Sequence, residues 1–217
     1  LVQTLYYLLR SACQARYGMP MARPRVPEAD NERRRQIVAA AMECFSRKGF
    51  ARATIADICR EAGVSPGHLY HYFPSKEALI EAIAAADLAA IRAFAAHLHG
   101  ENLLRESFGQ SAPGLGISGA LGFELMAEAV RNPRMHAIVH AHYTKVRALF
   151  AEQLRESQAL GLIPEHVDVE ALTVLYGVLR EGIATISAVE PAFLDAGFQR
   201  VLSAATRGAL QPEAHED

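Results

Sequence analysis

A short run of hydrogen-bonding side chains stands where a helix is expected to begin. Residues 65–72 read S-P-G-H-L-Y-H-Y, with Ser65 as the N-cap and Pro66 at the first helical position. Such a helix start presents backbone N–H groups and the positive end of the helix dipole, which together bind phosphate. Gly67 permits close backbone approach, and His68 can donate to or accept from a base edge. These residue types favour an element that contacts nucleic acid.

The elements around this run are predicted to be two short helices joined by a tight turn. Thr54, with Asp57 three residues later, is typical of a capping box and opens the first helix. Gly63 ends that helix, and the next one stops near Tyr72 because Pro74 cannot extend it. This spacing predicts a helix-turn-helix. Four residues are expected to close its small core: Ala56, Ile58, Val64 and Leu69.

The rest of the chain is also predicted to be helical, because apolar residues recur at three and four positions and no segment alternates like a strand. We expect an all-α fold, with an N-terminal three-helix domain that contains the helix-turn-helix and a larger helical domain after it. The expected domains are 1–28 (extension and arm), 29–76, 77–210 and a tail at 211–217. The expected helices are 31–48, 54–62, 65–72, 75–98, 101–108, 121–131, 134–160, 168–189 and 192–210.

Charge is distributed unevenly along the sequence. Residues 1–76 hold 12 Lys and Arg against 6 Asp and Glu, a net +6, which leaves 10 against 18, a net −8, for residues 77–217. A basic N-terminal third fits a nucleic-acid-facing part. The three cysteines, Cys13, Cys44 and Cys59, form no metal or disulfide pattern, which is typical of reduced thiols in the cytoplasm. Met19 or Met21 is the expected native start.

The run TIADICREAGVSPGHLYHYFPSKEALI, residues 54–80, closely resembles the DNA-binding signature of TetR-family regulators. The resemblance reaches back through residues 34–50, and residues 121–182 are similar to the C-terminal domain of regulators of the betaine-pathway type. It implies a regulator of the repressor kind that releases a palindromic operator when a small molecule binds. It also implies contacts with DNA from Thr54, Ser65, Pro66, Gly67, His68, Tyr70, His71, Tyr72 and Lys76.

The same resemblance implies how the larger domain works. Its last two long helices would pair with those of a second copy, giving a homodimer. Their apolar residues exceed what one thin subunit can bury. A small-molecule effector would lie among the middle helices, with no cofactor. The candidate lining residues are Phe94, Phe108, Phe123, Met126, Tyr143, Arg147, Tyr176 and Arg180.

Two alternatives stay open at this point. The chain could be a DNA-binding dimer that binds no ligand and acts either as an architectural regulator or under the control of a partner. It could, more remotely, be a helical metal hydrolase that uses His136, His140 and His142, since the first two are spaced to share one helix face. No glutamate follows His136 as a catalytic base would, and elemental analysis for zinc or iron would separate the enzyme from the regulator.

Overall fold

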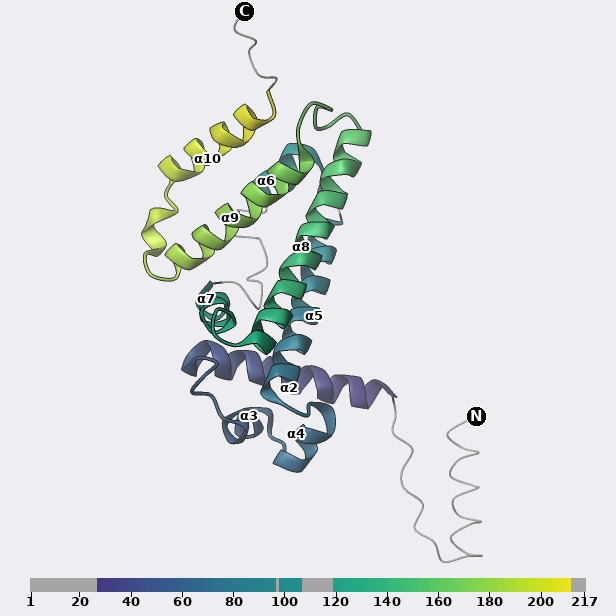
Figure 1. Ribbon diagram of the computed structural model, residues 1–217, viewed down its shortest axis with the longest axis vertical. Helices are drawn as coiled ribbons and strands as arrows, with labels where there is room; N and C mark the ends of the chain where they lie inside the picture. The colour runs from purple at the N-terminus through teal and green to yellow at the C-terminus, as the bar shows by residue number, and fades with distance from the viewer. Residues whose placement is uncertain (1–26, 97, 107–118, 212–217) are drawn as a thin grey trace, which may run out of the picture. The chain divides into compact units, whose positions relative to one another are not determined.

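All regular structure in the described part of the chain is helical. The computed structural model describes residues 27–96, 98–106 and 119–211, and it divides the chain into two units, residues 1–36 and 37–217. The described residues form nine α-helices and one 3₁₀-helix (Figure 1). The predicted all-α fold is confirmed. Four residues named from the sequence lie outside the described residues: Cys13, Met19, Met21 and Phe108.

Residues 27–36, the described part of the first unit, form the opening turns of helix α2 (Pro27–Lys48). The prediction that this helix starts at Asn31 was wrong, because a proline is tolerated in the first turn, where its missing N–H has no partner to lose. Side chains one turn apart bond to each other here. Arg35 pairs with Glu32 at 2.5 Å, and Arg33 donates to Gln36. The side chains of these four residues are exposed.

Three further helices follow within the second unit, and their local caps explain where they start. Helix α3 (Ile55–Ala62) has the predicted reciprocal capping box between Thr54 and Asp57. Ser65 accepts a hydrogen bond at the start of α4 (Pro66–Tyr72), and Ser75 does so at the start of α5 (Lys76–Ala95). We call residues 37–76 the head, and residues 77–211 the body.

The turn between α3 and α4 depends on Gly63, whose φ of +63° lies in the left-handed region. Val64 N–H then donates to the Cys59 carbonyl at 3.0 Å, which closes the turn. Ile58 and Leu69 are fully buried between the helices, and Val64 packs against them. Ala56 is exposed, so its predicted place in this core was wrong; α3 turns that residue outward.

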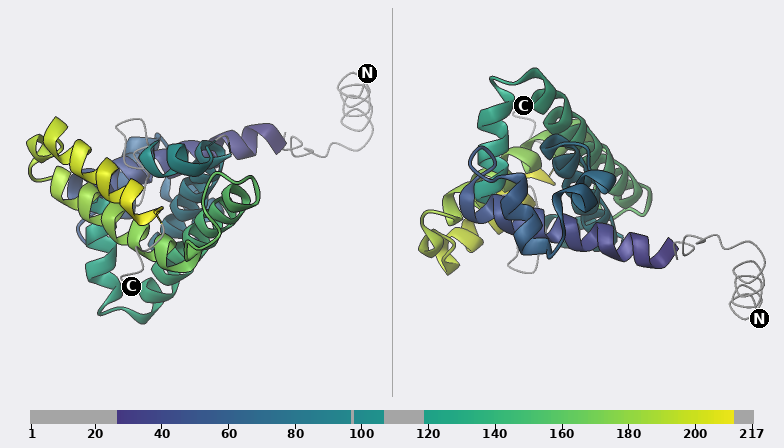
Figure 2. Two further views of the ribbon diagram at one scale, coloured as in Figure 1. Left: turned by 90° about the horizontal axis from the view of Figure 1, so that it is seen from above. Right: turned by 90° about the horizontal axis from the view of Figure 1, so that it is seen from below.

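The body consists of helices α5 to α10. After α5 come α6 (Gly100–Glu106), α7 (Gly119–Ala129), α8 (Pro133–Ala159) and α9 (Val169–Ser187). Helix α5 runs beside α8, and α7 packs on both α8 and α9 (Figures 1 and 2). The expected helix 192–210 is shorter than predicted. Pro191–Phe193 form the 3₁₀-helix, and Asp195 caps α10 (Ala196–Ala209).

Two apolar clusters hold the second unit together. The first contains the core of the head, the buried face of α7, and Met135 and Val139 of α8. The second lies within the body and contains residues of α5, α6, α8 and α9. Helix α10 has no buried residue. In the described ranges, no helix has the length and apolar character needed to cross a membrane.

Charge on Asp57 should contribute to the stability of the head. Its carboxylate lies 2.7 Å from Lys48 Nζ and accepts hydrogen bonds from Thr54. These bonds, with Lys48 first, hold the pKa of Asp57 well below its usual range. The stabilisation is therefore present above the ordinary carboxyl pKa of about 4 and is lost as pH falls through the lower folded value.

Asp57→Asn should consequently lower the melting temperature at pH 7, and the gap to wild type should narrow as pH falls below about 4. Thermal unfolding followed by circular dichroism at pH 7, 5, 4 and 3 measures this. Glu165→Gln, at an exposed position, is the control. A gap of equal size at pH 3 and pH 7 would contradict the assigned role of the charge.

Candidate nucleic-acid interface

One face of helix α4 is anchored in the first cluster, and the other face is exposed to solvent. Leu69 and Phe73 are buried in the first cluster, and Ser65 Oγ accepts from His68 N–H at 3.3 Å. Most of the other residues of α4 and its N-cap are exposed to solvent. Those exposed are Ser65, Pro66, Gly67, His68, Tyr70 and His71. The structure thus places six of the nine predicted DNA contacts on one surface.

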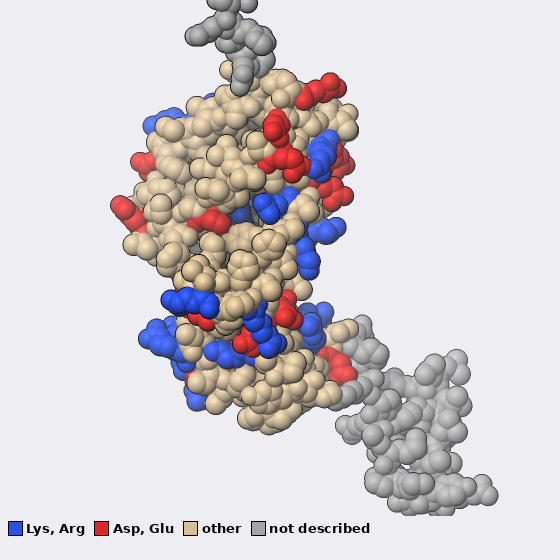
Figure 3. All heavy atoms as spheres, in the orientation of Figure 1, with Lys and Arg blue, Asp and Glu red and all other residues tan. Residues whose placement is uncertain are grey.

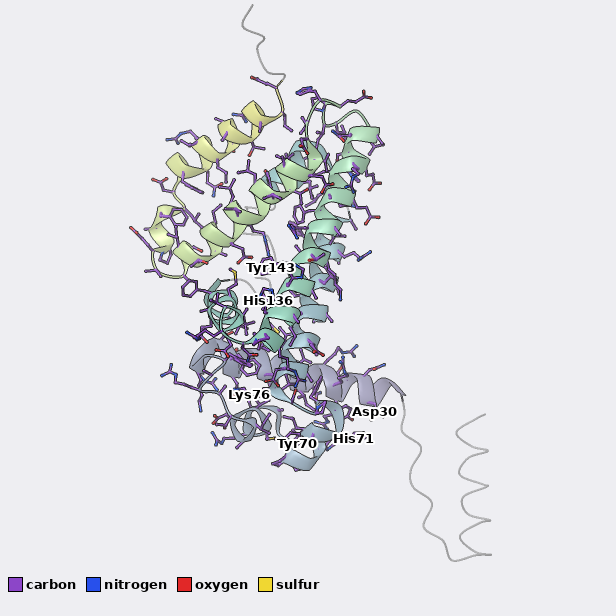
Figure 4. The ribbon with its side chains drawn as sticks, viewed as in Figure 1. Asp30, Tyr70, His71, Lys76, His136 and Tyr143 are labelled. Atoms are coloured by element: carbon purple, nitrogen blue, oxygen red, sulfur yellow. The ribbon has the colours of Figure 1, made fainter. Side chains whose placement is uncertain are left out.

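Aromatic contacts order the side chains of α4. The rings of His68 and Tyr72 stack at a centroid distance of 5.5 Å, and His71 meets the same tyrosine edge-on at 5.2 Å. Tyr72 is half-buried against the first cluster, whereas Tyr70 is 50% exposed. Tyr70 and His71 lie at the tip of the head (Figure 4). The helix carries no Lys, Arg, Asp or Glu, so its surface is neutral and hydrogen-bonding.

Thr54 lies exposed at the start of α3, where its hydroxyl already takes part in the capping box. The hydroxyl donates to Asp57 Oδ2 at 2.8 Å and accepts from Asp57 N–H at 3.1 Å. This bonding fixes the rotamer of Thr54 and leaves one oxygen lone pair. Lys and Arg side chains gather around α3 and the end of α2 that leads into it, on the face drawn in Figure 3.

Lys76 has a role that the sequence did not reveal. Its ammonium donates to the Phe50 carbonyl at 2.5 Å and lies 4.4 Å from the centre of the Phe50 ring. Burial lowers the pKa of this half-buried lysine. Lys76 therefore lies inside the head rather than at its tip (Figure 4). Because Phe50 is 26 residues away, no local sequence signal could have identified this bond.

The predicted effector residues divide into two groups. Arg147, Tyr176 and Arg180 line one cavity between α8 and α9, together with Val146, Phe150, Thr173 and Gly177. Among the other candidates that the structure describes, none lines it. Phe123 is 58% exposed, Met126 packs against the first cluster, and Phe94 is half-buried on α5.

A group of buried polar side chains lies beside this cavity, and we call it the central polar cluster. It consists of Asp87 on α5, His142 and Tyr143 on α8, and Arg180 and Glu181 on α9. His142 Nε2 lies 3.1 Å from Asp87 Oδ2, and Arg180 donates to Glu181 at 3.3 Å. The side chains of the arginine and of Glu181 are only 17% and 14% exposed. Sequence periodicity did not reveal the burial of Asp87 and His142, which requires knowing which helices pack together.

Several oxygens of this region lack a partner among the residues that the structure describes. They are Asp87 Oδ1, Glu181 Oε2 and, in the cavity wall, Thr173 Oγ1, whereas the Tyr143 hydroxyl interacts with the Glu181 carboxylate. Burial raises the pKa of Tyr143, and it also raises the pKa of Glu181 against the opposing charge of Arg180. Because buried polar atoms are nearly always hydrogen-bonded, these oxygens remain available to a hydrogen-bond donor.

The three histidines of the metal hypothesis do not come together. His136 and His140 stack at 5.9 Å on the exposed face of α8. His142 is buried and faces Asp87. In the described part of the chain, no three His, Cys, Asp or Glu side chains are grouped as a metal site requires.

Comparisons with known proteins place the chain among regulators. Residues 37–83 match the model of bacterial regulatory proteins of the tetR family, and residues 103–211 match that of the C-terminal domain of BetI-type transcriptional repressors. The HTH-type transcriptional regulator UidR of Escherichia coli is 32% identical over 189 residues, which are 82% of this chain and 92% of UidR.

Solved structures agree with these sequence matches. GusR of Salmonella enterica has a TM-score of 0.68 and 31% identity, and the match covers 82% of this chain and 95% of GusR. A regulator from Rhodococcus sp. has the same TM-score at 21% identity and shares the fold. The relatives are transcriptional regulators and not enzymes, which removes the metal hydrolase alternative. By its two domain matches and its relatives, this chain belongs to the TetR family of bacterial regulatory proteins.

Proposed function

We propose that this protein is a transcriptional repressor that binds a palindromic operator as a homodimer and releases it when a small polar effector binds the body. The observation that carries the proposal is helix α4, which is anchored by Leu69 and Phe73 and presents a neutral, hydrogen-bonding surface at the tip of the head. A helix of this type, second in a helix-turn-helix, enters the major groove. We expect the regulator to act in the cytoplasm.

The contacts with DNA fall into two kinds. The N-terminal end of α4, with Ser65, Pro66 and Gly67, provides the backbone approach to phosphate. His68 and His71 are placed to reach base edges, which is how a sequence is read. The remaining proposed contacts are to phosphate and come from Thr54, Tyr70, Tyr72 and Lys76. Residues 29–76 form the proposed DNA-binding domain, and residues 77–210 the regulatory domain.

The effector site is proposed at the cavity that Arg147, Tyr176 and Arg180 line, beside the central polar cluster. The unpartnered oxygens support a ligand that brings hydrogen-bond donors, because each buried unsatisfied oxygen costs free energy that a donor would recover. A ligand that favours one arrangement of the body by about 1–3 kcal/mol would change operator affinity by roughly 5–150-fold.

The first test is fluorescence anisotropy with labelled fragments from the DNA that flanks the gene of this protein. Saturable binding with two protomers per site, resistant to competitor DNA, is the expected result. In the same assay Tyr70→Phe should weaken operator binding about fivefold, since one hydrogen bond of ~1 kcal/mol is lost. Weak binding that is equal for all fragments, and that salt abolishes, would speak against sequence reading by α4.

Lys76 is expected to serve two roles that one variant can separate. Lys76→Met should lower the melting temperature, because the Phe50 carbonyl loses its donor. It should also reduce the slope of log affinity against log salt by about one, because a phosphate contact releases a counterion. Thermal unfolding and salt titrations of operator binding measure the two effects. A loss of stability with an unchanged salt slope would mean that Lys76 stabilises the fold through Phe50 and makes no contact with phosphate.

The proposed dimer interface is formed by α9 and α10, where apolar side chains are exposed on the isolated subunit. Val178 is 66% exposed, and Val174, Leu175, Ile186 and Val201 are similarly uncovered. Val178→Asp should convert the dimer to a monomer in sedimentation velocity, because it would place a charge in the apolar interface. Val130→Asp, at an 86% exposed position after α7, is the matched control. Dimers of unchanged affinity in the Val178 variant would place the interface elsewhere.

A further inference from the structure

The backbone N–H and carbonyl of Phe50 are held by two side chains, one from α7 and one from the first residue of α5. Phe50 N–H donates to Glu124 Oε2 of α7 at 2.7 Å. On its other side, the Phe50 carbonyl accepts from Lys76 Nζ at 2.5 Å. Phe50 follows the end of α2 and precedes α3. A single residue of the turn between two head helices is thus fixed by one carboxylate and one ammonium, both of which form strong, charge-assisted bonds.

Gly49 leaves the space that the Glu124 carboxylate occupies. A Cβ at this position would lie 2.6 Å from Glu124 Oε2 and 2.7 Å from Oε1. The φ of Gly49 is +80°, and its N–H donates to the Phe45 carbonyl at 2.8 Å, as at a helix C-cap. The glycine therefore serves both the end of α2 and the approach of α7.

Helix α7, which carries Glu124, packs against the head and also against neighbouring helices of the body. Leu121 and Leu125 are buried in the first cluster with the core of the head. The same helix packs against α8 and α9, and α9 provides Thr173, Tyr176 and Arg180 to the cavity wall. A shift of α9 or α8 on ligand binding would consequently reach α7 through direct packing.

The chain between Phe50 and α3 is too short to absorb a displacement. Ala53 N–H donates to the Gly49 carbonyl at 3.1 Å, and Arg52 Nε donates to the Lys48 carbonyl at 3.0 Å. Thr54, which caps α3, follows immediately. Any movement of the Phe50 peptide is therefore passed to the start of α3, and α3 is joined to α4 by a closed turn.

We propose that Glu124 is a positioning residue for DNA binding: by holding Phe50 N–H it sets the placement of α3 and α4, and a displacement of α7 releases it. This inference deepens the proposed function and rests on it, because it names the bond through which the effector-binding body acts on the head. Glu124 itself touches no DNA.

Glu124→Ala and the conservative Glu124→Gln, made in the full chain, test the proposal with two readouts. The first is hydrogen exchange of the Phe50 amide without DNA, measured by NMR. We expect about tenfold faster exchange in the alanine variant and an intermediate rate in the glutamine variant, whose amide oxygen still accepts. The second is operator affinity by anisotropy, expected to fall at least about fivefold in the alanine variant. Glu81→Ala, an exposed glutamate of α5, should change neither.

A second pair of variants tests whether Gly49 and Glu124 act together. Gly49→Ala should weaken operator binding in the wild-type background, both from backbone strain and from collision with the carboxylate. In the Glu124→Ala background the same change should cost less, because the carboxylate is gone. Equal losses in both backgrounds would contradict the proposed contact.

Other outcomes separate this proposal from the function on which it rests. Unchanged Phe50 exchange in Glu124→Ala would overturn the proposal, and so would faster exchange with unaltered operator affinity. Faster exchange across the whole chain would also overturn it, since the effect would then be general destabilisation. A wild-type protein that bound no operator would refute the proposed function, and the positioning role would fall with it.

Discussion

One apolar core joins the head to the body, and the placement of the helix that is proposed to contact DNA depends on it. Leu69 and Phe73 anchor the short helix α4 in the same cluster that buries Leu121 and Leu125 of α7. A helix of seven residues is too short to be stable in water by itself, so its orientation is set by this packing. Because packed interiors transmit displacement, the head cannot be reoriented without repacking α7.

The polar groups of the second unit occupy two places with opposite energetics. At the Phe50 peptide, donor and acceptor are both satisfied, and the bonds fix one arrangement of the turn. In the central polar cluster, Asp87 and Glu181 keep unpartnered oxygens in the described structure. A network whose hydrogen bonds are all formed makes the structure rigid. A network with unpaired groups costs free energy, which a bound ligand with matching groups would recover. On the proposed function, the second place responds to the effector and the first place carries the response to DNA.

The sequence predicted those features that depend on neighbours a few residues apart. The capping box at Thr54, the N-cap at Ser65 and the turn at Gly63 all involve bonds within one helical turn. These local signals were enough to predict where α4 lies in the sequence, and hydrophobic periodicity predicted that the other elements are helices. The contact of Gly49 with Glu124 lay outside this range, because no residue near Gly49 in the sequence indicates it.

Long-range contacts were missed, because they depend on which helices pack together. Lys76 was expected only at phosphate, and its bond to Phe50 spans 26 residues. The burial of Asp87 and His142 depends on the pairing of α5 with α8, which periodicity does not specify. For the effector site, aromatic residues at helical spacing did not distinguish core from cavity. Arg147, Tyr176 and Arg180 share the cavity, whereas Phe123 faces solvent.

On the proposed dimer, the uncovered apolar face of α9 and α10 would also govern how the regulator responds to its own abundance. If two copies must meet before either reads DNA, operator occupancy at low expression rises with the square of the protein concentration rather than in proportion to it. A modest change in synthesis or degradation would then produce a sharper change in the regulated gene. The apolar residues that stay exposed on α9 and α10 of a single subunit would in this way make expression of the regulated gene change sharply around a threshold protein concentration.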